Sequence, residues 1–266
     1  MGSKMKQTNV YFAKFFRLFL STAGWKVFIF AAIISGLIAA VVGGDMFEVG
    51  YKTETGCFAL VSACIWIGIF NSIQEICKER DIIKREYRSG LYISSYIRAR
   101  ARYELFICAI QALIMVIICG ITMDVPSEGL VFGNLNIDLF FIFFILLLSA
   151  DYLGIVISCI VKTTTTAMTV MPFVLIIQLV LSGVLFPLEG ATEKVASLTI
   201  SKWGMKAMGA ATDIESMGPV DYLLNKSGYP HKTSEVTGAL GTLILFAVLY
   251  LIIGGIFLKR VDKDKR

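Results

Sequence analysis

The stretch QEICKERDIIKREYRSGLYISSYIRARARYE, residues 74–104, decides how the rest of the chain is interpreted. It contains eight cations and five anions, and it lies between two long apolar segments. Ile76, Ile82, Ile83 and Tyr87 recur within it at helical spacing. A segment this charged does not span a bilayer, and its apolar stripe is typical of a short helix at the membrane surface. We therefore expect a helix that offers its polar face to a partner on the cytoplasmic side.

The composition is that of an integral membrane protein. Of the 266 residues, 56% are hydrophobic and 17% are charged, whereas soluble domains average roughly 25% charged residues. The chain is predicted to be all-α and a single membrane domain over 1–266. The net charge of +5 follows from the distribution of loops across the membrane and does not indicate nucleic-acid binding. The six cysteines lack CxxC spacing, so no metal site is expected, although a Cys57–Cys119 pairing stays open.

Six apolar runs are predicted to cross the membrane, each near the length of roughly 20 residues that a bilayer requires. They are residues 27–43, 57–76, 103–122, 139–161, 167–187 and 238–258. The aromatic and basic segment 8–25 precedes them, and we interpret it as an interfacial connecting helix or as an extension of the first span. Residues 188–237 are predicted to form short helices that re-enter the outer membrane interface.

The distribution of cations predicts the orientation. With both termini, residues 74–104 and the turn at 162–166 placed on one side, that side holds 19 of the 25 Lys and Arg residues. The positive-inside rule then assigns these segments to the cytoplasm. We expect the protein in the cytoplasmic membrane. An even number of spans is consistent with this assignment.

Asp151 stands near the middle of the run 139–161. An ionisable group at that depth is costly, so a functional role along a substrate path is one interpretation. A structural hydrogen bond is the other, and the sequence leaves both open. Asp151 is the one acidic residue away from the span ends, which is fewer than a proton- or sodium-coupled carrier usually has, and no Walker-type phosphate-binding loop occurs. Energy for uphill transport would therefore come from another chain.

Residues 79–100, ERDIIKREYRSGLYISSYIRAR, resemble the first intracellular loop of ABC-2-type permeases. The likeness is closest to G-subfamily half-transporters and to bacterial exporters that carry a forkhead-associated domain with a fused ATPase. The matching positions are Glu79, Glu86, Tyr87, Gly90, Tyr92, Ser94, Ser95 and Tyr96. A second match is SGVLFPL at 182–188, followed by ISKWGMKA at 200–207, where Ser201 and Lys202 replace the family's usual Pro-Arg. That departure leaves the role of this turn open.

The resemblance implies a permease subunit with the coupling helix at 78–87. Two copies would face each other as a homodimer or a heterodimer, and each would dock one ABC ATPase subunit. ATP and Mg would bind to the ATPase, and this chain would hold no cofactor and perform no catalysis. The residues implied in ATPase coupling are Lys78, Glu79, Arg80, Lys84, Arg85, Glu86 and Tyr87. The alternative is a solvated charged loop that only satisfies topology.

By the same resemblance, the second and fifth spans would line the substrate path. The candidates are Ile67, Phe70 and Asn71, then Val184 and Leu185 as an apolar plug, with the polar span residues Asp151 and Gln178 added. Lys202 and Trp203 would belong to the outer re-entrant turn. An apolar, aromatic path suits amphipathic cargo such as lipids, lipid-linked glycans or hydrophobic peptides.

Three functions remain in competition. The sequence favours the permease half of an ATP-driven exporter that works by alternating access. The main alternative is a non-transporting sensor or assembly partner built on the same scaffold, and the third is a secondary transporter or channel. Membrane lipids are expected partners in every case.

Overall fold

The computed structural model describes residues 2–47, 50–214 and 228–261. Every regular element in this part of the chain is a helix, which confirms the all-α prediction for these residues. Parts of the predicted outer region (215–227) and of the basic tail (262–266) lie outside the described residues.

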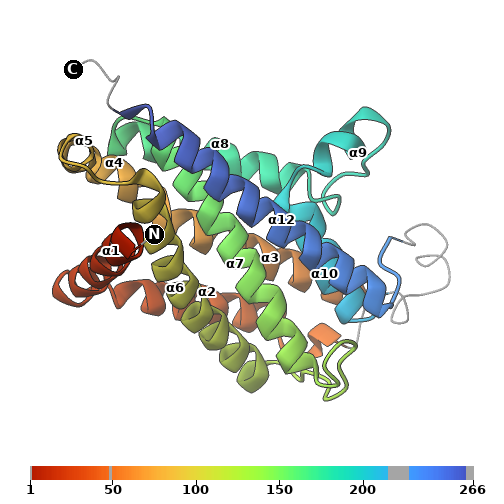
Figure 1. The fold of residues 1–266 in the computed structure, drawn as a ribbon. Coiled ribbons are helices and arrows are strands. Elements are labelled where there is room, and N and C mark those ends of the chain that lie inside the picture. The colour runs from red at the N-terminus through yellow and green to blue at the C-terminus, as the bar shows by residue number, and fades with distance from the viewer. Residues whose placement is uncertain (1, 48–49, 215–227, 262–266) are drawn as a thin grey trace.

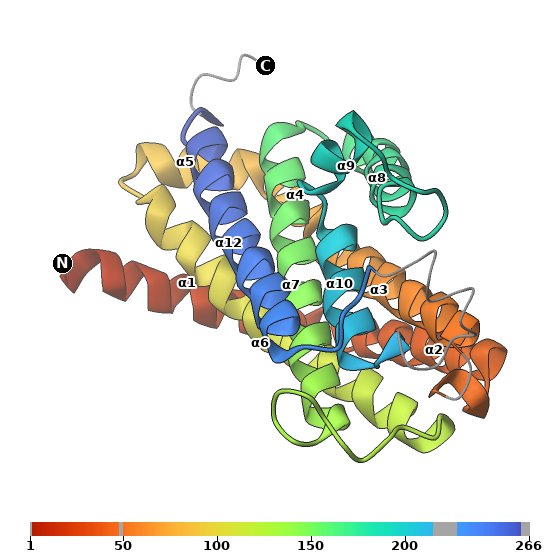
Figure 2. The same ribbon diagram turned by 90° about the vertical axis from the view of Figure 1, so that its right-hand side faces the viewer.

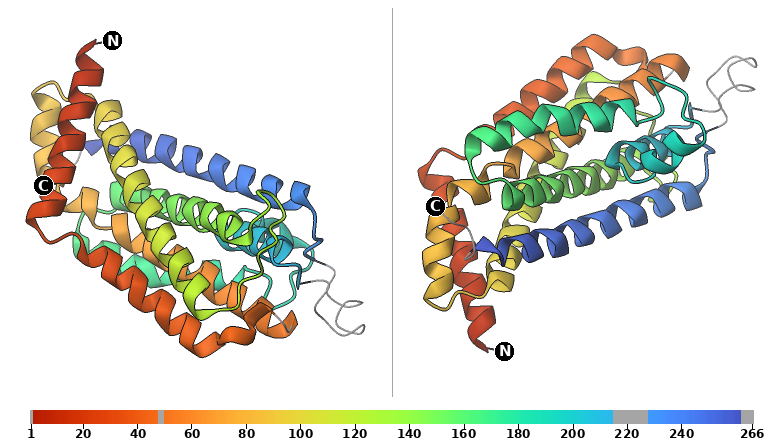
Figure 3. Two further views of the ribbon diagram at one scale, coloured as in Figure 1. Left: turned by 90° about the horizontal axis from the view of Figure 1, so that it is seen from below. Right: turned by 90° about the horizontal axis from the view of Figure 1, so that it is seen from above.

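Two helices at an angle open the chain. α1 (Gly2–Ser21) and α2 (Lys26–Val42) meet at 69°, and Ala23 between them has a φ of 54°, a left-handed conformation that does not continue a helix. α1 is therefore not a straight extension of α2, and it lies across one end of the bundle (Figure 3). The helix predicted at 8–25 is present and begins earlier. Its place at the membrane surface stays a prediction.

The charged stretch forms two short helices and the beginning of a long one. α3 (Gly50–Ser72) leads into α4 (Glu75–Lys78), α5 (Arg80–Arg88) and α6 (Ile93–Thr122). The segment 78–87 is thus divided at Glu79, and most of it forms α5. α6 begins well before residue 103, because Tyr96 is buried against the ring of Phe15 in α1 and the helix continues through it.

The short 3-10 helix η1 (Gly44–Phe47) lies between α2 and α3. The remaining elements follow α6. They are α7 (Leu135–Ile160), α8 (Thr164–Val180), α9 (Ala191–Ala196), α10 (Ile200–Ala211) and α12 (Thr233–Leu258). α8 ends before the predicted limit at residue 187, because the chain turns at Gly183, which has a φ of 87°. The predicted outer region includes α9 and α10, and α10 is buried against α3, α7 and α12.

Four helices in the described residues are long and apolar enough to cross a membrane: α3 continued by α4, then α6, α7 and α12. The bent pair α1 and α2 is a candidate for a fifth crossing, and α8 is apolar but has only 17 residues. These helices confirm a multi-pass membrane protein. The count of six spans stays a prediction.

α7 occupies the centre of the bundle, with α3, α6, α10 and α12 packed around it (Figures 1 and 2). Two glycines permit the closest contacts between α3 and α7. A Cβ atom on Gly68 would lie 2.5 Å from the carbonyl oxygen of Leu147, and one on Gly154 would collide with Ser72. Small residues therefore bring these two helices together, and α3 carries the predicted path residues.

All six cysteines are free and buried, so the Cys57–Cys119 disulfide that the sequence left open is not formed. The thiol of Cys57 instead contacts the hydroxyl of Thr212 at 3.6 Å. Buried thiols here pack as small apolar groups.

Candidate functional site

The first candidate site is α5 and the helices that hold it. The Tyr11 hydroxyl of α1 donates a 2.8 Å hydrogen bond to the Glu86 carboxylate. Glu79, at the start of α5, accepts a 3.0 Å hydrogen bond from the Tyr96 hydroxyl and pairs with Lys14 at 3.5 Å. Both carboxylates therefore face the protein, and they join α5 to α1 and α6.

Arg80 fastens α5 to a third helix. Its Nη1 donates to the carbonyl oxygens of Cys159 and Val161, each at 3.0 Å, at the C-terminal end of α7. The guanidinium charge also lies at the negative end of the α7 dipole, which is a favourable position for a cation. A displacement of α5 would therefore be passed to the central helix of the bundle.

The turn between α5 and α6 is held by one side-chain amide. Gln7 of α1 donates from Nε2 to the Gly90 carbonyl at 3.2 Å, and its Oε1 accepts from the Tyr92 N–H at 3.1 Å. Gly90 has a φ of 100°, a conformation that favours glycine. This accounts for the glycine of the quoted motif, and the Gln7 side chain joins α1 to the turn.

The opposite face of α5 is exposed. Asp81, Ile82 and Arg85 point outward, whereas Ile83 is fully buried and Tyr87 is half-buried. Of the apolar residues at helical spacing, Ile83 is buried against the bundle, whereas the Ile82 side chain is 38% exposed between Asp81 and Arg85. An isoleucine between two charges is a suitable centre for a protein contact.

The other predicted coupling residues lie beside this face. Lys78 is exposed and pairs with Glu75 at 3.4 Å, and Lys84 is half-buried. Of the seven residues, Glu79, Arg80 and Glu86 are engaged by other helices of the same chain, and contact of any of them with an ATPase stays a prediction.

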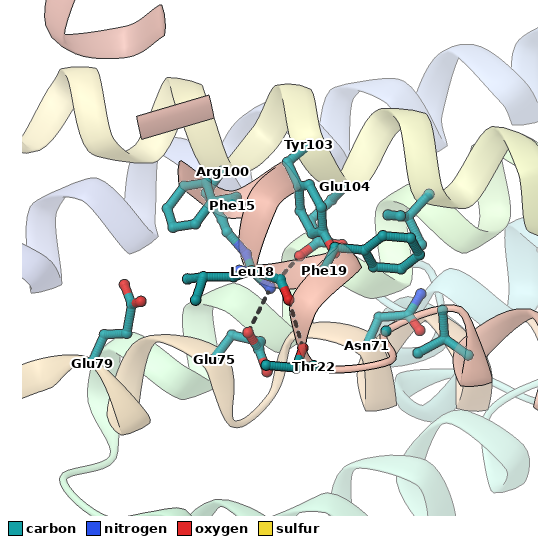
Figure 4. Close-up of a pocket in the computed structure, with 13 residues that line it drawn as sticks. Phe15, Leu18, Phe19, Thr22, Asn71, Glu75, Glu79, Arg100, Tyr103 and Glu104 are labelled. Carbon is teal, nitrogen blue, oxygen red and sulfur yellow. Dashed lines mark hydrogen bonds and ion pairs between the residues drawn. The ribbon is translucent and has the colours of Figure 1, made fainter. Parts of the chain in front are cut away.

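A buried charge cluster lies under α1, and the sequence analysis missed it. Arg100 of α6 pairs with Glu75 of α4 at 3.2 Å and more closely with Glu104, one helical turn away. Its guanidinium also lies 5.2 Å from the ring centre of Phe15 and 5.1 Å from that of Tyr103. The cluster borders a cavity of about 150 Å³ (Figure 4). The spacing of four residues between Arg and Glu was the available signal.

Asp151 is fully buried next to this cluster. Its carboxylate accepts a hydrogen bond from the Cys108 thiol at 3.5 Å, and its backbone carbonyl accepts one from the Ser72 hydroxyl at 2.6 Å. The carboxyl groups of Asp151 and Glu104 are close enough to influence each other's charge. It does not line the cavity that contains the predicted path residues of α3, so the structure places it in the internal polar network.

The second candidate site is an apolar cavity of about 210 Å³ between α2 and α3. It is lined by Val27, Phe30, Ile34, Trp66, Ile67, Phe70 and Asn71. The structure thus brings together the three path residues predicted on α3. The prediction missed Trp66, Phe30 and Ile34, although Trp66 stands beside Ile67 in the sequence and is 53% exposed.

Asn71 connects the two cavities, since it lines both. Its amide forms a reciprocal pair with Gln111 of α6. Asn71 Nδ2 donates to Gln111 Oε1 at 2.8 Å, and Gln111 Nε2 donates back to Asn71 Oδ1 at 3.2 Å. Because Gln111 is fully buried, this pair satisfies polar groups that have no access to water.

The other predicted path and outer residues lie apart from this cavity. Gln178 of α8 accepts a hydrogen bond from the Ser201 N–H at 3.1 Å and so holds the beginning of α10. Leu185 is 51% exposed in the turn after α8, and Val184 beside it is half-buried.

The outer turn is cross-linked by the two residues predicted there. Trp203 Nε1 donates to the Ser197 carbonyl at 2.8 Å, and Lys202 Nζ donates to the Ser197 hydroxyl at 3.2 Å. Lys202 also pairs with Glu193 at 3.7 Å. These contacts fasten α10 to α9 even though Lys202 occupies the place of the family's arginine. Across the described residues, no group of three or more His, Cys, Asp or Glu side chains is arranged to hold a metal ion.

Comparison with known proteins identifies the scaffold. The model of the ABC-2 type transporter family matches residues 9–210, from α1 to α10. The chain belongs to the ABC-2 type transporter family. This ABC-2 chain is 24% identical over 248 residues to an ABC transporter ATP-binding/permease protein of Mycobacterium tuberculosis. The alignment covers 88% of this chain and 29% of that relative, so the chain spans less than a third of the relative's length. It is thus the membrane permease component of an ABC transporter.

Proposed function

We propose that this ABC-2 chain is the permease subunit of an ATP-driven exporter, and that the exposed face of α5 docks an ABC ATPase that binds ATP and Mg. The single observation that carries the proposal is that side-chain hydrogen bonds join α5 to three other helices. Tyr11, Tyr96 and Arg80 join it to α1, α6 and α7, while the side chains of Asp81 and Arg85 are exposed.

This arrangement suits mechanical coupling. A helix bonded to three others moves with them as a unit, so a push from an ATPase would rock the bundle instead of bending a loop. The mycobacterial relative is named for both ATP-binding and permease functions. We propose that two ATPase copies serve one dimer of this permease, and that the ATPase lies on a separate chain.

The cargo would be amphipathic. The cavity between α2 and α3 offers aromatic and aliphatic walls, with the amide of Asn71 as its polar group. Its volume of about 210 Å³ is below the range of roughly 300–1,000 Å³ for sites that enclose drug-sized ligands. We therefore propose that a lipid, a lipid-linked glycan or a hydrophobic peptide binds only when the site is enlarged across a dimer axis.

A second copy would supply that enlargement. Phe173, Ile176 and Ile177 on α8 are each more than half exposed, and Trp66 and Phe70 on α3 are about half exposed. α3 and α8 are in contact, so these apolar side chains belong to neighbouring helices. The proposed homodimer packs along them, in the cytoplasmic membrane with both termini in the cytoplasm, as the distribution of 19 of the 25 cations favours.

Reconstitution tests the function. The permease and its cognate ABC ATPase are placed in proteoliposomes, and ATP hydrolysis and movement of fluorescent phospholipid or lipid-linked glycan are measured together. We expect ATP-dependent export that an ATPase variant unable to hydrolyse ATP abolishes. A stable complex that moves none of the amphipathic cargo classes would contradict the exporter and favour the sensor or assembly role.

A further inference from the structure

A groove of about 420 Å³ runs between the beginning of α6 and the end of α12, away from both candidate sites. The two helices lie side by side at the end of the bundle that carries α5 (Figure 2). The α12 wall is apolar and open to the outside, since Val248, Ile252 and Ile256 are each about half exposed. The groove is therefore accessible from the membrane.

Cations occupy one end of this groove. Its lining includes Arg98 and Lys259 and contains no Asp or Glu. Neither cation forms an ion pair with a carboxylate in the described part of the chain. Arg98 uses only its Nε, which donates to the Ser94 carbonyl at 3.0 Å. Two cations that pair with no carboxylate of the described residues, at the mouth of an apolar groove, match a ligand with an anionic head and an apolar body.

The length of the groove fits one leaflet. From Val248 to Lys259 the α12 wall rises about 16 Å, at about 1.5 Å per helical residue. That is about half of a hydrocarbon core roughly 30 Å thick. The cations therefore lie at headgroup depth when the apolar wall lies beside the acyl chains.

Gly255 leaves space in the floor of the groove. A Cβ atom built on it meets no atom within 4 Å, whereas the neighbouring Gly254 packs against Ile155 and Cys159 of α7. Gly255 is thus free of helix packing, and a larger side chain there fills the groove without disturbing the bundle.

We infer that this groove binds one anionic phospholipid, with its phosphate at Arg98 and Lys259 and an acyl chain along the apolar wall of α12. The inference does not depend on the transport function. It depends on the proposed orientation only for the leaflet, which is the cytoplasmic one. A second copy of the chain is a poorer occupant, because a two-fold contact would bring the same cations against each other.

Native mass spectrometry of the purified full chain tests the site. Phosphatidylglycerol and phosphatidylcholine with identical acyl chains serve as probes. We expect one tightly bound phosphatidylglycerol per chain. The affinity should fall about fivefold for each cation removed in Arg98→Gln and Lys259→Gln. Gly255→Leu should weaken the binding of both lipids, because the leucine side chain blocks the path of the acyl chain.

Matched variants separate a built site from general attraction. Arg102→Gln with Arg260→Gln removes the same charge nearby but outside the lining, and Gly241→Leu adds the same bulk at another unobstructed position of α12. Both should bind phosphatidylglycerol like the parent. Equal binding of the two lipids, an equal loss in the control variants, or a dimer peak that disappears with Gly255→Leu would overturn the inference.

Discussion

Tyr11 in α1 and Glu86 in α5 are joined by a 2.8 Å hydrogen bond across 75 positions of sequence. The bond makes the N-terminal helix a brace for the helix that we propose to meet the ATPase. Tyr11→Phe removes the donor and leaves a part-buried carboxylate without it, at a cost of about 1–2 kcal/mol. We expect faster amide hydrogen exchange throughout α5 and weaker coupling of ATP turnover to transport.

Tyr51→Phe is the control for this prediction, because the Tyr51 side chain is exposed on α3. It should leave exchange in α5 unchanged. Equal exchange in the parent and in Tyr11→Phe would show that α1 does not brace α5.

Arg100 holds Glu75 and the buried Glu104 together, so its loss should be among the most damaging changes in the chain. Arg100→Leu leaves Glu104 without its cation, while Glu75 keeps Lys78, and removal of one partner of a buried ion pair costs about 3–5 kcal/mol. Thermal stability in detergent should fall steeply, and Arg100→Leu combined with Glu104→Leu should recover part of it.

Arg102→Leu is the matched control on the same helix. Arg102 is exposed, and a surface substitution usually changes stability by within about 0.5 kcal/mol. If Arg102→Leu and Arg100→Leu were equally tolerated, the charge cluster would have no structural role.

The amide pair of Asn71 and Gln111 separates stability from cargo binding. Asn71→Leu leaves the buried Gln111 amide without its partner, at a cost of about 1–3 kcal/mol. Asn71→Leu combined with Gln111→Leu removes both polar groups and should recover stability. Transport should stay impaired in the double variant, because the cavity has lost its polar group. Normal transport in that variant would place Asn71 outside the cargo path.

Phe70 tests the cavity wall with little risk to folding, since its ring is 48% exposed. Phe70→Ala should raise, about tenfold, the cargo concentration that gives half-maximal stimulation of ATP turnover. This change corresponds to the loss of one aromatic contact. Leu37→Ala, at an exposed position of α2 outside the cavity lining, is the control. An identical concentration dependence in Phe70→Ala and Leu37→Ala would exclude the cavity as a cargo site.

The sequence predicted best what depends on local pattern. The helix near 78–87 and the apolar runs follow from spacing along one element. Ile67, Phe70 and Asn71 were named from the family resemblance, and their role in a cargo path stays a prediction. The errors arose where distant elements decide the environment. Arg100 stands in the charged run RARARYE, yet it is buried, and Phe15, far away in the chain, packs against its guanidinium. The spacing of Ile82 and Ile83 likewise does not say which of the two the rest of the chain covers, and the structure buries Ile83 and exposes Ile82.

The exposed face of α5 carries the central claim, and site-specific photocrosslinking tests it most directly. A photoreactive residue is placed at Ile82 in cells that express the full chain, and crosslinked partners are identified by mass spectrometry. The same residue at Arg17, on the exposed side of α1, is the control. We expect position 82 to capture an ABC ATPase and position 17 to capture little of it. Capture of no ATPase at position 82, or equal capture at the two positions, would contradict the account.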